Sequence, residues 1–479
     1  MRTYLTAATG AEDGEYIGVD FGGTNLRALR VHFEKGSVVK KEVKRLNLKK
    51  VDKTGTREQL FDKMAQLVGS LSLNPDQKYS LGFVCAFPMQ QNSLNDGRLI
   101  KWQKGFDIAG VEGENVIHLF QEALDRNGLT NISVKAVLND TPATHLLVPS
   151  ATAAMIFSSG FDTTMVDPRT EEILNMESGD FRVGFTTPYD EEVYNLSVPK
   201  QSNRFEKRIT GSPLGELTRL ILRDLNKQGR LFLAPLLTLD REESFSNELM
   251  SKIEGAQNLR EVIRILEEEK TLNVSGVRKQ DAQLVLEVSQ LVSNRAARLV
   301  AATLTTIIRE VDPHLQKKEH IIAVDGSVYN KYTRMKQRVH EAMREIVGDY
   351  ADKIKLISIE DASGIGAAMA AARVESQEKS DQAIPRQEDT KANDKATATV
   401  GAKDTVGGID FNPAYLDLEI KRDGKGVPLP VNLQDVEAIK MRLNGFQPVM
   451  INVTPAKNLL LLLGITESSA VQPQLSSVN

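Results

Sequence analysis

Short apolar segments recur along the first 375 residues of the chain, and several end in a cluster of Gly, Asp or Ser. Such a cluster is the usual signal of a turn directly after a buried strand. Between these segments lie longer stretches with apolar residues at helical spacing. We therefore predict a mixed α/β protein over residues 16–375. The predicted strands are Tyr16–Val19, Leu26–Val31, Tyr79–Ala86, Ile132–Leu138, Ala153–Phe157, His320–Val324 and Ile354–Ile359.

The clearest helical pattern runs from Asp281 to Val311. Apolar residues recur there at steps of three and four, which places them on one face of a helix. Tyr332–Val347 and Ile365–Val374 are shorter helical segments. The alanines at 367–372 suit close packing of the last helix against a neighbouring element.

Composition changes after Val374. Residues 375–406 are rich in Lys, Asp, Gln, Thr and Ala and almost free of large apolar side chains. Such a segment cannot bury enough surface to offset the entropy of ordering, so we predict a disordered linker. Apolar strand-like runs resume afterwards, and residues 407–479 are predicted to form a small β-rich C-terminal module of unknown role.

The 479-residue chain has a formal net charge of −4, which favours neither nucleic acid nor a membrane surface as a partner. No apolar run is long enough to span a bilayer. The one cysteine, Cys85, excludes an internal disulfide and a multi-cysteine zinc site. The N-terminal residues lack the apolar stretch of a signal peptide, so we expect a cytoplasmic protein. The sequence indicates no protein partner.

One candidate phosphate site follows the first long strand. The strand ends in Asp20 and is followed by Gly22, Gly23 and Thr24. Glycines let backbone N–H groups approach phosphate oxygens without a Cβ in the way, and Thr24 adds a hydroxyl donor. The Asp20 carboxylate would meet a hydrated Mg²⁺ held by those phosphates. The alternative is a plain β-hairpin with a Gly-Gly turn.

Two further glycine turns have related chemistry. Asp325-Gly326-Ser327 again places an acid, a glycine and a hydroxyl at the end of an apolar strand, which suggests two halves that face one nucleotide. The third turn contains Ser363 and Gly364 and opens a predicted helix, whose free N–H groups and positive dipole end suit an anion. A simple strand-to-helix turn and helix packing are the respective alternatives.

A candidate catalytic base lies in Asn139-Asp140-Thr141, directly after a buried strand. Phosphoryl transfer from ATP needs an in-line nucleophile, charge stabilisation and a carboxylate that accepts the proton of the attacking hydroxyl. Asp140 could be that carboxylate. The alternative is a helix N-cap ahead of Pro142.

Together these segments resemble the hexokinase family of the actin-like ATPase fold, over about residues 16–372 and in the family's order. The single tryptophan, Trp102, falls at the family's Trp position. The matching segments are residues 20–27 (first phosphate motif), 81–106 (sugar-binding signature), 139–141 (catalytic Asn-Asp-Thr), 175–181 and 204–216 (sugar-binding glutamates), and 325–327 and 360–366 (second phosphate and adenosine motifs).

The resemblance implies a two-lobed α/β protein of the actin-like ATPase (ribonuclease H-like) fold. It places the small lobe in residues 1–138, with residues 355–374 returning to it, and the large lobe in residues 139–354. The lobes would close over a sugar and Mg-ATP and expel water, which could otherwise accept the phosphoryl group.

The resemblance also implies an enzyme that uses ATP and Mg²⁺ to phosphorylate a hexose, most simply glucose, at the 6-hydroxyl. Asp140 would be the general base, with Lys104 near the site of transfer. The implied sugar-binding residues are Asn139, Glu177, Glu206, Gln103, Asp162, Phe87 and Pro88. The implied ATP-binding residues are Asp20, Gly22, Gly23, Thr24, Asn25, Arg27, Ser159, Gly160, Asp325, Gly326, Ser327, Ser363 and Gly364, with Asp20 meeting Mg²⁺ through water.

Four positions depart from the family's pattern. Ala86 and Gln103 each replace a hydroxyl residue expected to touch sugar, and Asp162 replaces an amide in the turn 158–162. Pro142-Ala143 replaces a small flexible pair. Loss of one hydrogen bond to a buried polar group costs about 1–3 kcal/mol, so these changes could weaken glucose binding or redirect specificity. Two alternatives therefore stand beside a hexokinase: a sugar or nucleotide sensor with little turnover, and a kinase for another sugar or polyol.

Overall fold

The computed structural model describes residues 2–23, 25–181, 184–197, 202–317 and 319–383. Thr24 and residues 384–479, and with them most of the predicted linker and the whole C-terminal module, lie outside the described residues. No helix in the described part combines the length and apolar character needed to cross a bilayer.

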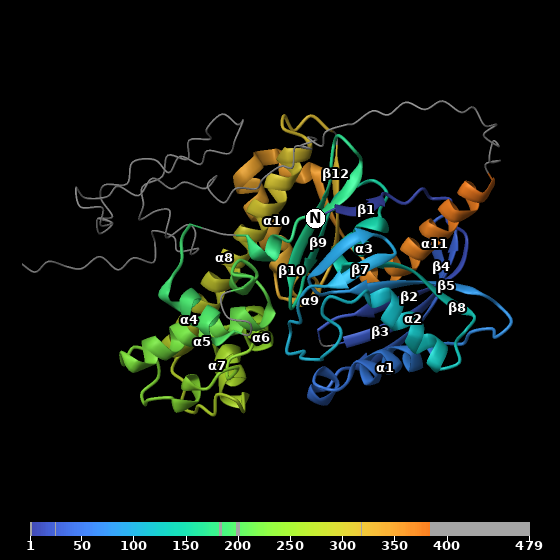
Figure 1. Ribbon diagram of the computed structural model, residues 1–479. Helices are drawn as coiled ribbons and strands as arrows, with labels where there is room; N and C mark the ends of the chain where they lie inside the picture. The colour runs from blue at the N-terminus through green and yellow to red at the C-terminus, as the bar shows by residue number, and fades with distance from the viewer. Residues whose placement is uncertain (1, 24, 182–183, 198–201, 318, 384–479) are drawn as a thin grey trace, which may run out of the picture.

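The small lobe is built on a five-stranded sheet in the order β4-β3-β2-β5-β8. Strands β2 and β5 near its middle are buried on both faces because helices cover both sides, whereas β3 alternates buried and partly exposed residues. Helices α1 and α2 pack on one face (Figure 1). The elements are β2 (Gly14–Phe21), β3 (Asn25–Glu34), β4 (Ser37–Asn47), α1 (Arg57–Gly69), β5 (Tyr79–Cys85), β6 (Met89–Ser93), β7 (Asp96–Leu99), α2 (Val116–Arg126) and β8 (Ile132–Leu138).

The large lobe has a six-stranded sheet in the order β1-β11-β10-β9-β12-β13. A helical region packs beside it around the long helix α8, whose buried stripe forms the centre of the lobe's core. The elements are β1 (Arg2–Thr6), α3 (Asp140–Leu146), β9 (Ala151–Phe157), β10 (Phe161–Val166), β11 (Glu172–Asn175), α4 (Pro188–Leu196), α5 (Gly211–Lys227), α6 (Asn247–Gly255), α7 (Leu259–Glu268), α8 (Lys279–Val311), β12 (His320–Asp325), α9 (Ser327–Lys331), α10 (Met335–Val347) and β13 (Ile354–Ser358).

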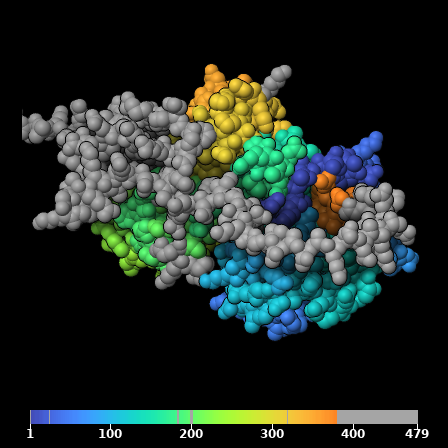
Figure 2. All heavy atoms as spheres, turned by 45° about the horizontal axis from the view of Figure 1, so that its top comes forward, coloured from blue at the N-terminus to red at the C-terminus, as the bar shows by residue number. Residues whose placement is uncertain are grey.

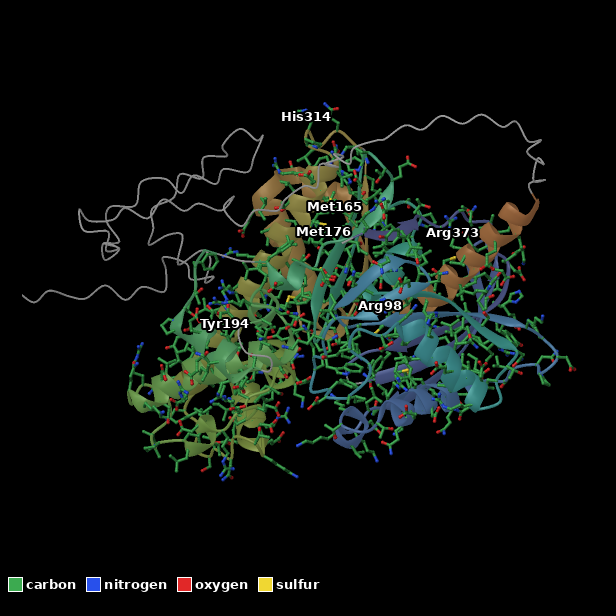
Figure 3. All side chains as sticks on the ribbon, viewed as in Figure 1. Arg98, Met165, Met176, Tyr194, His314 and Arg373 are labelled. Atoms are coloured by element: carbon green, nitrogen blue, oxygen red, sulfur yellow. The ribbon has the colours of Figure 1, made fainter. Side chains whose placement is uncertain are left out.

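The two lobes occupy opposite sides of the molecule. The blue and cyan atoms of the small lobe gather away from the green atoms of the helical region (Figure 2). Arg98 and Arg373 lie with the small lobe, whereas Tyr194 of α4 lies in the helical region, and Met165 and Met176 lie between them near the large sheet (Figure 3).

Helix α11 (Ala362–Ala383) is the last described element of the chain, and it packs on the small lobe, which is built from early residues. It packs against β2, β5 and β8 of the small sheet and against α3 (Figure 1). Glycines make this contact close: a Cβ on Gly18 would lie 1.9 Å from the Gly364 carbonyl oxygen. The alanines at 367–372 are all buried there.

Three predicted boundaries were wrong. Strand β1 pairs with β11 (Glu172 partners Thr6), so residues 2–6 belong to the large sheet rather than the small lobe. Strand β13 pairs with β12, so only α11 returns to the small lobe. Helix α11 continues to Ala383, into the segment predicted to be a disordered linker, where Glu375 accepts a hydrogen bond from Ser80 and pairs with Lys379.

Candidate active site

The predicted base begins helix α3 at the junction of the lobes. Asn139 is the N-cap of this helix, and its Oδ1 accepts a hydrogen bond of 2.8 Å from the Asp140 amide. The capping role considered for Asp140 therefore belongs to Asn139. Asp140 Oδ1 accepts from the Thr141 amide (2.9 Å), and no partner is found for its Oδ2 within the described residues. That oxygen is free to accept a proton.

Charged neighbours surround Asp140. Burial raises its pKa, the nearby Lys104 ammonium opposes that rise, and the Asp20 carboxylate adds to it. Burial also raises the pKa of Glu177, and the charge of Asp140 raises it further. The pKa of Asp162 is raised by burial and then by Glu177. The structure thus brings these predicted residues close enough to act on one another.

Lys104 lies between the first phosphate turn and the rest of the sugar loop, the name used here for residues 86–106 of the predicted sugar-binding signature. Its Nζ donates a hydrogen bond of 2.6 Å to the Ala86 carbonyl and lies 5.3 Å from the centre of the Phe87 ring. Its stem covers Gly23 so closely that a Cβ there would lie 2.5 Å from Lys104 Cδ. A larger residue at position 23 would have to displace the Lys104 side chain.

The sugar loop itself is held by backbone hydrogen bonds. The Pro88 carbonyl accepts from the Ile100 amide (2.9 Å), and the Gln103 carbonyl accepts from Phe106 (3.1 Å). Phe87 is buried against Trp102, their ring centres 5.1 Å apart. Phe87 therefore supports the loop, and the direct sugar contacts of Phe87, Pro88 and Gln103 stay predictions.

The two predicted sugar-binding glutamates come from loops of the large lobe. Glu177 has a left-handed backbone (φ 51°), and its Oε1 accepts from Asn175 Nδ2 (3.0 Å). Glu206 Oε2 accepts from the Phe161 amide (3.0 Å), and burial raises its pKa. Oε2 of Glu206 would lie 3.2 Å from a Cβ at Gly160, so the two segments are in close contact.

Asp162 ties these loops together. Its Oδ1 accepts from the Thr163 and Ser178 amides, both at 2.7 Å. The carboxylate therefore fixes the backbone next to Glu177. The side-chain oxygen of an asparagine, the residue of the family's pattern at this position, could accept the same two hydrogen bonds. The Asp162 that stands here therefore keeps the same loop conformation.

Asp20 and Arg27 connect the first phosphate turn to helix α11. Asp20 Oδ2 accepts from Arg27 Nε (2.8 Å) and from Ser363 Oγ (2.9 Å). The turn is closed by the Gly22 amide, which donates to the Asn25 carbonyl (3.0 Å). Two segments predicted to bind ATP, residues 20–27 and 360–366, thus meet here. Gly364 packs against Leu29, and its predicted ATP contact stays a prediction.

Residues that the sequence did not identify extend this network. Asp361 accepts hydrogen bonds from Arg27 Nη1 (3.2 Å), Lys41 Nζ (3.2 Å) and Arg45 Nη2 (2.8 Å). Burial raises the pKa of Asp361, but the hydrogen bonds and charges of Arg45 and Lys41 outweigh this effect and lower it. The sequence held only a weak signal for this cluster of cations. Lys41 and Arg45 are four residues apart in strand β4 and so lie on one face of the sheet.

The second phosphate turn faces the first from the large lobe. Gly326 has φ 127°, and a Cβ there would lie 2.3 Å from the Phe157 carbonyl oxygen, so this position requires glycine. The Gly326 amide donates to Asp325 Oδ1 (2.7 Å). Burial raises the pKa of Asp325, whereas the Arg27 guanidinium lowers it, which places the two turns within electrostatic reach.

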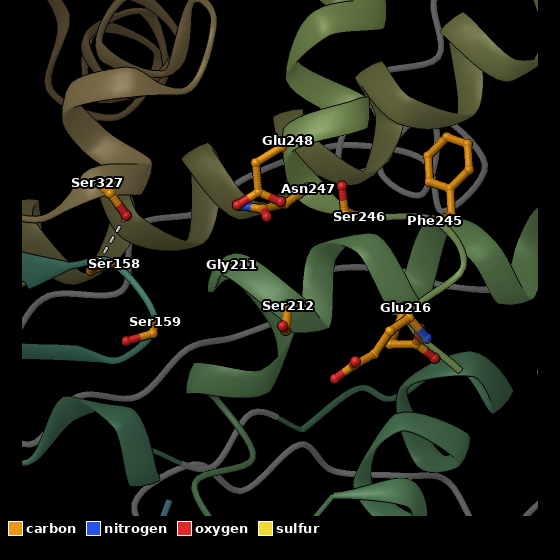
Figure 4. Close-up of a pocket in the computed structure, with 11 residues that line it drawn as sticks. Ser158, Ser159, Gly211, Ser212, Glu216, Phe245, Ser246, Asn247, Glu248 and Ser327 are labelled. Atoms are coloured by element: carbon orange, nitrogen blue, oxygen red, sulfur yellow. Dashed lines mark hydrogen bonds between the residues drawn. The ribbon is translucent and has the colours of Figure 1, made fainter. Parts of the chain in front are cut away.

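A cavity of about 350 Å³ opens beside this turn (Figure 4). Ser327 Oγ lies 3.0 Å from Ser158 Oγ at its edge. The charged side chains of its lining are all carboxylates, and Glu216 among them is paired with Arg219. The lining residues are Ser158, Ser159, Gly211, Ser212, Glu216, Glu243, Phe245, Ser246, Asn247, Glu248 and Ser327.

Most of the cavity lining was not predicted, although Ser159 and Ser327 were. The segment 243–248 carries one local signal, because Ser246 caps helix α6 by accepting from the Leu249 amide (3.1 Å). That signal identifies a helix start but not a ligand site. Gly211 begins α5 and adjoins Ser158, whose carbonyl accepts its amide (3.2 Å).

The carboxylates at the two turns fit a magnesium ion that arrives with a nucleotide. Within the described residues no group of three or more His, Cys, Asp or Glu side chains could hold a metal by itself. Mg²⁺ usually keeps several waters and uses one or two carboxylates plus substrate phosphates. Asp20 and Asp325 offer such oxygens.

Two lobes, each with an Asp-Gly turn, and a partly buried carboxylate between them form the arrangement expected of a kinase of the actin-like ATPase fold. Family models described as hexokinase match residues 1–148 and 152–373. Hexokinase-1 of Schizosaccharomyces pombe is 33% identical over 393 residues, which cover 76% of this chain and 80% of that protein. Hexokinase-3 of Oryza sativa subsp. japonica is 32% identical over 411 residues, covering 78% and 81%.

Solved structures agree with this. The hexokinase of Schistosoma mansoni complexed with glucose aligns with a TM-score of 0.69 and 28% identity, covering 78% of this chain and 88% of that one. The chain belongs to the hexokinase family. It is a hexokinase-type phosphotransferase, which phosphorylates hexoses with ATP.

Proposed function

We propose that the chain transfers the γ-phosphoryl group of Mg-ATP to the 6-hydroxyl of glucose, with Asp140 as the general base. The observation that carries this proposal is the Asp140 side chain. One of its oxygens is held by the Thr141 amide, the other has no partner within the described residues, and the Lys104 ammonium is near. A carboxylate fixed at one oxygen and open at the other suits abstraction of a hydroxyl proton.

The sugar would lie against Asn139, Glu177 and Glu206, whose oxygens can accept hydrogen bonds from its hydroxyls. Asn139 is constrained by its capping bond, and the two glutamates are held by Asn175 Nδ2 and the Phe161 amide. Acceptors that are already fixed lose little entropy when the sugar binds. The hexokinase of Schistosoma mansoni was solved in complex with glucose, which supports this choice of hexose.

The nucleotide would span both lobes. The cavity beside Ser159 and Ser327 has only carboxylates among its charged side chains, so it suits the base and ribose rather than the phosphates. The triphosphate would extend toward the Gly22–Gly23 turn, where Arg27 supplies positive charge. Mg²⁺, when bound, would neutralise the phosphate charge that develops during transfer, with Asp20 and Asp325 as its nearest carboxylates.

A coupled assay of ADP release from the purified chain tests the proposal. With ATP, Mg²⁺ and a panel of hexoses, polyols and sugar derivatives, we expect glucose-dependent ADP release and glucose 6-phosphate as product. Omission of Mg²⁺ should abolish release. A sugar that raises the melting temperature without ADP release would instead support a sensor, and turnover of another compound alone would support a kinase with altered specificity.

The departures at Ala86 and Gln103 bear on the Michaelis constant for the sugar. Each removes a hydroxyl that could bond to it, while Lys104 and the Ala86 backbone still form the loop. We therefore expect a higher KM for glucose than a loop with both hydroxyls would give, with kcat less affected.

A further inference from the structure

The loop that carries Lys104 has an unusual backbone. Lys104 and Gly105 are consecutive left-handed residues, with φ 58° and φ 81°. Glycine adopts this conformation readily, but a lysine does so at a cost in free energy. Contacts from elsewhere in the molecule must hold Lys104 in this conformation.

Lys53 supplies such contacts from a different segment. Its Nζ donates a hydrogen bond of 3.0 Å to the Lys104 carbonyl and lies 5.2 Å from the centre of the Phe106 ring. Its own carbonyl accepts from the Asp107 amide (2.8 Å). One residue therefore holds both ends of the left-handed turn.

Lys53 is itself anchored and lies close to Lys104. It ends the 3₁₀ helix Lys50–Lys53, in which Asp52 accepts from the Lys49 amide (2.7 Å) and pairs with Lys63. Burial lowers the pKa of Lys53, and the charge of Lys104 lowers it further, so the two ammonium groups are neighbours. No carboxylate is paired with Lys53 within the described residues. Its ammonium group interacts instead with the Lys104 carbonyl and the face of the Phe106 ring.

We propose that Lys53 is a positioning residue for the transfer reaction: it fixes the left-handed turn at Lys104 and thereby keeps the Lys104 side chain between the Gly23 turn and the Ala86 carbonyl. Without it, the Lys104 backbone would relax toward right-handed geometry, which would move the side-chain stem away from Gly23 and the ammonium away from the Ala86 carbonyl. The inference rests on the proposed role of Lys104 and adds a residue to it.

The test uses Lys53→Met and Lys53→Arg in the full chain, with Lys50→Met as the matched control. Lys50 lies in the same 3₁₀ helix and is exposed, and its side chain makes no hydrogen bond or ion pair with the Lys104 loop in the described structure. We expect Lys53→Met to lower kcat about tenfold, to change the melting temperature little, and to be rescued largely by Lys53→Arg. A kcat of Lys53→Met within twofold of the parent value would overturn the proposal.

A double-mutant cycle with Lys104→Met separates positioning from an independent contribution. If Lys53 acts through Lys104, adding Lys53→Met to Lys104→Met should reduce kcat no further. A further tenfold loss in the double variant would show that Lys53 acts by another route. If Lys104→Met itself retains full turnover, the proposed role of Lys104 in transfer is wrong. That outcome is distinguishable from a failure of the Lys53 proposal alone.

A readout without turnover keeps the inference testable in every case. Trp102, the only tryptophan of the chain, stacks on Phe106 at 5.2 Å between ring centres. We expect greater quenching of its fluorescence by acrylamide and faster amide hydrogen exchange across residues 103–107 in Lys53→Met, but not in Lys50→Met. Unchanged exchange across this loop would contradict the positioning role even if the parent chain showed no kinase activity.

Discussion

Replacement of Asp140 by alanine or asparagine is expected to lower kcat by about a thousandfold, because a positioned general base contributes roughly 10²–10⁴ to the rate. Asparagine keeps the size of the side chain, and its Oδ1 can still accept from the Thr141 amide, but it cannot take up a proton. The measurement is glucose-dependent ADP release at saturating ATP and Mg²⁺. The two substitutions should give similar losses if proton transfer is the missing step.

Two controls make this result specific. Asp125→Asn makes the same chemical change on the exposed face of α2, where Asp125 accepts a hydrogen bond from Gln121, and should leave kcat unchanged. Glucose should still raise the melting temperature of the Asp140 variants, because the proposed sugar-binding residues Glu177 and Glu206 remain. Asp140→Asn with near-parental turnover would exclude Asp140 as the base.

The pH profile of the parent enzyme should carry the signature of a buried base. Burial and the Asp20 carboxylate raise the pKa of Asp140, with Lys104 opposing them. Because the base works in its deprotonated form, kcat/KM should fall as the pH drops, and the fall should begin above the ordinary aspartate pKa of about 3.9. Melting curves over the same pH range distinguish this loss from unfolding, and a flat profile down to pH 4 would contradict it.

The sequence was most informative where burial decides the structure. All seven predicted strands are confirmed, and so is the helix from Asp281 to Val311, which is α8. Strands β5 and β9 are buried almost throughout, whereas β13 is a mostly exposed edge strand that its isoleucines and leucine still revealed. Strand β4 was missed because it is a sheet edge: its exposed Lys and Arg side chains show no apolar alternation. Strand β1 was missed for a different reason: only Thr3 and Leu5 of its five residues are buried, so it carries no apolar run.

The same distinction applies to the site. Motifs that are continuous in sequence, such as Asn139-Asp140, could be predicted from their residues and their order. The Asp361 network could not, because Lys41 and Arg45 are more than 300 residues from their partner. The cavity was missed likewise, since packing of α5 and α6 beside β9 brings Ser212 and Asn247 next to Ser158.

A second large effect is expected in the core, from Gly82→Ala. Gly82 lies in the middle of β5, beside Gly18 of β2. A Cβ there would lie 1.8 Å from the Ala367 carbonyl oxygen and 2.5 Å from its carbon. These are backbone atoms of α11, so no side chain can rotate away, and the helix must shift as a whole. Overpacking of this kind costs about 1–3 kcal/mol and at times more, so a fall in melting temperature of about 2–12 °C is expected.

Gly69→Ala provides the matched control. A Cβ at Gly69 would lie 3.5 Å from Leu129 Cδ1, an ordinary contact, and alanine favours the helix in which Gly69 lies. This variant should melt at or slightly above the parent temperature. Equal melting of Gly82→Ala and Gly69→Ala would mean that α11 does not approach the small sheet this closely.

The Gly82 substitution should also reach the active site, because α11 contacts both the sheet and the helix that begins with Asp140. Gly366 packs on α3, where its Cβ would lie 1.9 Å from the Ala143 carbonyl oxygen. A shift of α11 away from Gly82 therefore changes the support of α3 and moves Asp140 relative to Lys104, which lies in the small lobe. When kcat is measured at a temperature well below the melting temperature, we expect it to be lower in Gly82→Ala than in the parent. A kcat equal to the parent value would show that α3 is held by the large sheet alone.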